Sequence, residues 1–170
     1  QYHWASGEQD RAIEYGQRCL ERAAARGDLA LSITGLFYLC HAYHVTGRYA
    51  ETLERTREIL ALLEGPQATE RFGLSGLPYS GSCALAAESL GELGDHAGAL
   101  ELIRRGQRVA DKADHLYSQM VLAASHGDVL VSANRVDEAI AVLEPAVRTC
   151  REKNCYGQLI NALKHLGRAY

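Results

Sequence analysis

The sequence lacks the features of several large functional classes. No apolar run approaches the 18 residues that a membrane-spanning helix requires, so we expect no membrane partner. Lysine and arginine are not clustered, and the formal net charge is −3 at pH 7. Nucleic-acid binding depends on clustered cations that neutralise phosphates, so we expect no nucleic-acid partner either.

Signatures of disulfides and of secretion are also missing. The five cysteines form no Cys-x-x-Cys pair, and an odd number cannot close into a complete set of disulfides. Cys40 and Cys83 fall within apolar stretches, where a thiol behaves as a small hydrophobic group. This usage favours a reducing, cytoplasmic location. The first residues carry neither a start Met nor a signal-peptide pattern, so we expect the chain to be a piece of a longer protein.

The familiar catalytic motifs are absent as well. There is no GxxxxGKS/T or GxGxxG phosphate-binding loop, no GxSxG nucleophile elbow and no HExxH zinc motif. His41 and His44 lie three residues apart on one expected helix, but no third metal ligand is near them in the sequence. We therefore predict no enzymatic activity, no metal and no other cofactor.

What the sequence does contain is a repeat of about 40 residues, a period typical of stacked supersecondary units. A turn residue recurs at Gly7, Gly47, Gly94 and Asn134, with spacings of 40, 47 and 40. Asn can replace Gly because it tolerates the left-handed conformation at a helix C-terminus. After each turn, inward positions advance by four, three, four and three residues, which draws one stripe along an α-helix.

The helix before each turn carries a small residue at one register position, and a small side chain there lets the neighbouring helix approach closely. These residues are Cys40, Ala87, Gly127 and Gly167.

We predict an all-α fold, a right-handed superhelical solenoid of antiparallel helix pairs, with residues 1–170 forming one domain. The repeat units span about 1–27, 28–65, 77–114, 115–154 and a partial 155–170. Eight helices are expected, at 8–26, 29–45, 48–64, 77–93, 95–113, 116–133, 135–153 and 156–170. The surplus of the 47-residue spacing falls in segment 64–82, which holds four Gly and two Pro. We interpret that segment as a longer loop without an element of its own, either functional or a packed surface strap.

The stretch LCHAYHVTGRYAET, residues 39–52, resembles the tetratricopeptide (TPR) family. Five residues match that family's first-helix and turn pattern, namely Leu39, Cys40, Tyr43, Gly47 and Tyr49. Thr52 departs from the family's usual Ala.

Repeats of about 40 residues resemble the longer-helix variety of the TPR family. Within it, ERFGLSGLP followed by LGELGDHAGAL and ADHLYS is similar to the C-terminal repeat region of bacterial adenylate/guanylate cyclase-type ATPase regulators. This resemblance implies a non-catalytic interaction, regulatory or sensor module of a bacterial signalling protein.

In a solenoid of this kind, the first helix of each pair lines the concave surface that binds partners. The residue after the small position, and the one three before it, should point into that groove. We predict aromatic and histidine groups at one end, carboxylates in the middle and cations at the other end, which suits a peptide or protein segment. The alternative is that these positions are merely solvated. The candidate binding residues are Phe37, His41, His44, Glu88, Asp128, Lys164 and Arg168.

Two further hypotheses remain open. The chain is a small-molecule sensor if a pocket lies beneath the 64–82 loop, where Arg71, Phe72 and Tyr79 are the candidate contacts. The chain is instead a free-standing adaptor if it forms a two-fold homodimer through its last helix, which is not capped by polar residues. The apolar residues of that helix are Leu159, Ile160, Leu163 and Leu166.

Overall fold

The computed structural model describes residues 7–170, and residues 1–6 of the first predicted unit lie outside that range. Within it the chain forms eight α-helices, one 3-10 helix and no strand, as an all-helical solenoid requires. Each α-helix falls within two residues of its predicted ends. The elements are α2 (Gln9–Arg26), α3 (Leu29–Val45), α4 (Tyr49–Leu62), η1 (Gly65–Thr69), α5 (Pro78–Glu92), α6 (His96–Lys112), α7 (Leu116–Ser132), α8 (Val136–Glu152) and α9 (Tyr156–Ala169).

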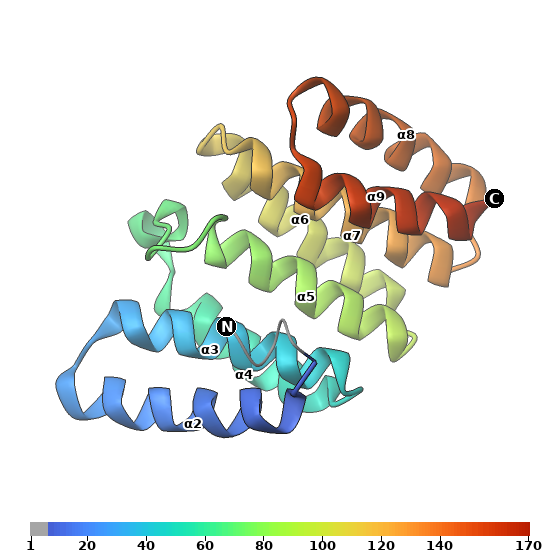
Figure 1. Ribbon diagram of the computed structural model, residues 1–170. Helices are drawn as coiled ribbons and strands as arrows, with labels where there is room; N and C mark the ends of the chain where they lie inside the picture. The colour runs from blue at the N-terminus through green and yellow to red at the C-terminus, as the bar shows by residue number, and fades with distance from the viewer. Residues whose placement is uncertain (1–6) are drawn as a thin grey trace.

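The helices stack in chain order from α2 at one end to α8 and α9 at the other (Figure 1). Three consecutive pairs, α3 with α4, α5 with α6 and α7 with α8, pack as antiparallel hairpins. The first helices of successive pairs also contact one another, α3 against α5, α5 against α7 and α7 against α9. These four helices therefore form one continuous layer, which is the layer that the sequence predicts to line the groove.

Left-handed residues end the first helix of each pair, as the turn pattern predicts. Gly47 has φ 74°, Gly94 has φ 84° and Asn134 has φ 56°. In all three turns, the N–H of the next residue donates to the carbonyl five residues earlier, at 2.8–2.9 Å. This bond satisfies a carbonyl that the helix end leaves unpaired, and it sets the angle at which the second helix returns.

The small-residue position lets helices approach closely where α7 crosses α8. A Cβ added to Gly127 would lie 2.3 Å from Cγ of Leu143, whose side chain is fully buried. Leu143 thus occupies the space that any larger residue at 127 would need. Cys40 and Ala87, at the same register position in α3 and α5, are also fully buried.

The expectation that segment 64–82 contains no element is wrong. Gly65–Thr69 forms the 3-10 helix η1, with Pro66 near its start, where the fixed φ of proline suits a helical turn. The segment is anchored because Ala68, Leu74 and Leu77 are buried. Of the two interpretations of this segment, the packed strap describes its backbone better.

Candidate functional site

A groove runs along the first helices α3, α5, α7 and α9, with a volume of about 780 Å³. Part of the long connection, Leu74–Leu77, closes one side. Five of the seven candidate residues line it, namely Phe37, His41, His44, Glu88 and Lys164. Sequence reasoning missed several other lining residues on the same helices, which are Tyr38, Tyr117, Ser125, Gln158, Asn161 and His165.

The α3 end of the groove is aromatic. The rings of Phe37 and His41 meet edge to face with centroids 4.8 Å apart, and those of His44 and Tyr49 lie 5.5 Å apart. Burial, and secondarily the neighbouring His44, lowers the pKa of His41 from 6.5 to about 4. His41 therefore contributes a neutral ring, and this end suits an apolar or aromatic group.

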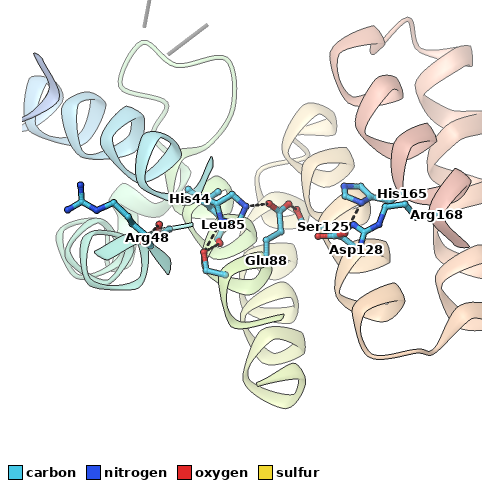
Figure 2. Close-up of polar contacts among 10 residues, drawn as sticks. His44, Arg48, Leu85, Glu88, Ser125, Asp128, His165 and Arg168 are labelled. Atoms are coloured by element: carbon cyan, nitrogen blue, oxygen red, sulfur yellow. Dashed lines mark hydrogen bonds and ion pairs between the residues drawn. The ribbon is translucent and has the colours of Figure 1, made fainter. Parts of the chain in front are cut away.

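Glu88 of α5 lies at the centre of the groove, where two neighbouring helices hold its carboxylate (Figure 2). The hydroxyl of Ser125 on α7 donates to its Oε1. On the other side, Nε2 of His44 lies 3.5 Å from its Oε2. The central carboxylate predicted from the sequence is therefore present and oriented, with part of its surface open to solvent.

The orientation of the His44 ring follows from its other nitrogen. Nδ1 lies 2.9 Å from Oγ of Ser89, and that hydroxyl already donates to the carbonyl of Leu85 at 2.9 Å. Ser89 can then only accept, so Nδ1 of His44 carries a proton. His44 is thus fixed between α3 and α5 with Nε2 directed at Glu88.

The prediction that Asp128 points into the groove is wrong. Asp128 is buried between α7 and α9, where Nδ1 of His165 lies 2.8 Å from its Oδ1 and Arg168 also contacts Oδ1 (Figure 2). Burial raises the pKa of Asp128, but the hydrogen bond from His165 and the charges of His165, Arg168 and Lys164 outweigh it and lower that pKa.

Arg168 likewise does not line the groove, because its guanidinium turns to Asp128. Lys164, one turn before it, does line the groove and is exposed. The charged groups that a ligand meets are therefore Glu88 at the centre and Lys164 at the α9 end. Their order is the predicted one, but each position has one charged group where the sequence predicted two.

The three loop candidates do not come together in a pocket. Arg71 is exposed and its Nε donates to the carbonyl of Leu74 at 3.0 Å. Phe72 has φ 50°, and its carbonyl accepts from Thr34. Tyr79 is buried and its hydroxyl accepts from Arg105 of α6. The part of the segment that does reach the groove is Leu74–Leu77.

A second hollow of about 650 Å³ lies along α2, and three of its six lining residues are arginines. Arg18, Arg22 and Arg26 follow one another by one helical turn along it. Arg18 lies over the ring of Tyr15 and 3.7 Å from Glu14. The side chains form an exposed helix face rather than a set of groups converging on one point.

No group of three or more His, Cys, Asp or Glu side chains in residues 7–170 is arranged to hold a metal ion. None of the helices α2 to α9 is both long enough and apolar enough to cross a membrane.

The fold is a TPR-like helical-repeat solenoid. No protein-family model matches the sequence, and no curated protein is similar to it.

Two similar solved structures are crystal structures of a Podospora anserina protein described as a kinesin light chain with nearly identical TPR-like repeats, one of them carrying Q17M. The Q17M structure has a TM-score of 0.69 over 99% of this chain and 80% of its own. The other has a TM-score of 0.68 over 99% and 81%. Sequence identity is 16% to both, so the likeness concerns the fold alone.

Proposed function

We propose that this chain is a non-catalytic module that binds a peptide or protein segment in the groove along α3, α5, α7 and α9. The observation that carries the proposal is the polarity of that groove. It has neutral aromatic rings at the α3 end, an oriented carboxylate at Glu88 and an exposed ammonium at Lys164. A matching segment carries an apolar or aromatic side chain, then a cation or hydrogen-bond donor, then a carboxylate.

The experiment is selection of binding peptides from a displayed random library on the 170-residue protein, followed by affinity measurements on groove variants. Lys164→Glu should weaken a selected peptide at least tenfold, because it reverses the only exposed cation among the groove-lining residues described. Lys112→Glu on α6 makes the same charge change outside the groove and is the matched control. If the selected peptides bind both variants equally well, the groove is not their binding site.

A second variant tests the aromatic end without changing charge. A Cβ added to Gly81 would lie 2.8 Å from Cε2 of Phe37. Gly81→Ala should therefore push that ring into the groove, since the end of a flexible side chain can move. We expect weaker peptide binding with an unchanged helical circular dichroism spectrum. A selected peptide whose affinity tolerates both Gly81→Ala and Lys164→Glu binds elsewhere.

We also propose that the module regulates a larger bacterial signalling protein in the cytoplasm. The resemblance of segments 70–78 and 90–100 to repeat regions of cyclase-type ATPase regulators supports this setting, and five unpaired cysteines suit a reducing compartment. Binding in the groove would shift the adjoining modules only as far as the ligand discriminates between their arrangements. The alternative is a free-standing dimeric adaptor. An antibody against this domain separates the two on a denaturing gel of source-cell lysate, by a band far above 18.6 kDa or one near it.

A small-molecule sensor is a second candidate because Leu74–Leu77 of the long connection closes one side of the groove. A small ligand held there should raise the melting temperature, and shortening the connection should abolish that rise. A metabolite library that leaves the melting temperature unchanged removes this candidate without affecting the peptide proposal.

A further inference from the structure

Two cysteines lie on either side of the turn between α8 and α9. Cys150 is in the last turn of α8 and is fully buried, whereas Cys155 is the N-cap residue of α9 and is partly exposed. The backbone N–H of Cys155 donates to the carbonyl of Cys150 at 2.8 Å. With standard backbone dimensions, this bond keeps the two Cα atoms within the roughly 4.4–6.8 Å that disulfides span.

The two side chains are also in contact, because the thiol of Cys155 is a hydrogen-bond partner of the Cys150 thiol. Cys155 makes no capping hydrogen bond to the first turn of α9. At the same position before α3 and α7, the side chains of Asp28 and His115 do accept such a bond. The thiol of Cys155 therefore serves its neighbouring thiol and not the end of its helix.

The other turns that join one helix pair to the next have the same backbone bond without the thiols. Asp28 donates to the carbonyl of Ala23 after α2, and His115 donates to that of Ala110 after α6. Both alanines are fully buried, as Cys150 is. Packing at this position therefore requires a small side chain, but it does not require sulfur, and it does not explain a second thiol beside the first.

We propose that Cys150 and Cys155 form a reversible disulfide, which makes the turn between α8 and α9 a redox-sensitive modification site. The co-reactant is a low-molecular-weight disulfide, of which oxidised glutathione is the example used here. The thiolate of Cys155 attacks one of its sulfurs, the S–S bond of the co-reactant breaks, and one glutathione leaves as a thiolate. Cys150 then gives its proton to solvent and attacks the sulfur of Cys155, and the second glutathione leaves. Two cysteine thiols are thereby oxidised, and one glutathione disulfide is reduced to two thiols.

The order of these steps follows from exposure and from the coupling of the two thiols. Cys155 reacts first because it is the exposed member of the pair. Burial, and secondarily the charge and hydrogen bond of Cys155, raises the pKa of Cys150. Once Cys155 is bonded to glutathione, only burial still opposes ionisation of Cys150, so the second step becomes easier. The proposal goes beyond the groove function and does not depend on it.

The experiment is incubation of the folded 170-residue protein with oxidised glutathione, followed by blocking of free thiols, tryptic digestion and mass spectrometry without reduction. Trypsin cleaves after Arg151 and Lys153, between the two cysteines. The disulfide therefore appears as peptide 149–151 joined to peptide 154–164. We expect this joined pair in protein that runs as a single chain on a non-reducing gel, and we expect dithiothreitol to abolish it.

Cys150→Ala is the matched control, because Ala23 and Ala110 occupy the same position in α2 and α6. In this variant Cys155 should keep one glutathione, since no thiol remains to displace it. Cys19 is also partly exposed and its thiol faces the carbonyl of Leu31, so it should keep one glutathione in both proteins. Circular dichroism establishes that each protein is folded.

Three results would overturn the proposal. Cys155 of the wild type keeps its glutathione as the variant does, or it is joined to a cysteine other than Cys150, or the joined pair forms only in urea. Each of these results would mean that the folded turn does not bring the two sulfurs into reacting positions.

Discussion

Adding one methyl group at equivalent positions of two helices should change stability in opposite directions. Gly127→Ala adds the methyl where α7 crosses α8, and its Cβ would lie 2.3, 2.4 and 2.6 Å from Cγ, Cδ2 and Cδ1 of Leu143. Gly167→Ala adds it at the same register position of α9, where nothing lies within 4 Å. Both changes replace Gly by Ala inside a helix, so the gain in helix propensity is the same in both. They differ only in how the added methyl group packs.

Helix propensity favours Ala over Gly by about 1 kcal/mol, because Gly loses more backbone entropy when it enters a helix. Overpacking a close-packed core costs about 1–3 kcal/mol. Three contacts below 3.0 Å to the branch of a fully buried Leu143 place this site near the upper end of that range. Gly127→Ala should therefore lower the free energy of unfolding by about 2 kcal/mol, or the melting temperature by about 4–8 °C. Gly167→Ala should raise the free energy of unfolding by up to about 1 kcal/mol.

Urea unfolding followed by circular dichroism measures both values, at a protein concentration where the wild type sediments as a monomer. Leu143→Ala provides a coupling test, because it removes the side chain that the new methyl group would meet. In a double-mutant cycle, Gly127→Ala should be at least about 0.5 kcal/mol less harmful when Leu143 is already Ala. If Gly127→Ala and Gly167→Ala both stabilise the protein, the close packing of α7 on α8 is not what requires glycine at 127.

Three further predictions concern titration and thiol reactivity. Burial lowers the pKa of His41 from 6.5 to about 4, so the unfolded chain binds the proton more tightly. The free energy of unfolding should then fall by at most about 3 kcal/mol as pH drops from 6.5 to 4, and fall less in His41→Phe, by urea titration at each pH. The pKa of Asp128 is lowered, so the contacts of its carboxylate stabilise the fold above the ordinary pKa of 3.8, and this stabilisation is lost as pH falls below that value. Asp128→Asn should lower the free energy of unfolding by about 1.5–3 kcal/mol at pH 7 in the same assay. Iodoacetamide should label Cys19 and Cys155 before Cys83, whose pKa burial raises to about 12, and early labelling of Cys83 in peptide mass spectra would contradict that burial.

Much of the fold could be predicted because its determinants are local. The turn residues Gly47, Gly94 and Asn134 each stand where a left-handed conformation ends a helix. The apolar spacing between them then fixes helix length and the face that packs. The element that was missed, Gly65–Thr69, is too short for a periodic signal. Its position depends on Ala68 and Leu74 reaching a core that other segments build.

The groove was partly predictable for a related reason. Register within a helix identifies which residues face one side, and five of seven candidates do line the groove. Register does not say how near the next helix comes. At Asp128 the neighbouring α9 places Nδ1 of His165 2.8 Å from Oδ1 and brings Arg168 into contact, so a residue expected to point into the groove is buried in an ion pair. A charge reversal at Asp128 would therefore report mainly on stability, because it would break the contacts with His165 and Arg168.

The two acidic residues follow one structural rule with different consequences. Glu88 contacts Ser125, and Asp128 contacts His165, and in both cases the partner lies 37 residues later on the next first helix. At the step from α3 to α5 the same positions hold His41 and Leu85, which form no such polar pair. A hydroxyl partner leaves the charge of Glu88 intact, whereas His165 and Arg168 surround that of Asp128. Of these two acids, only Glu88 keeps a charge that the next helix does not compensate. That charge gives the centre of the groove its polarity.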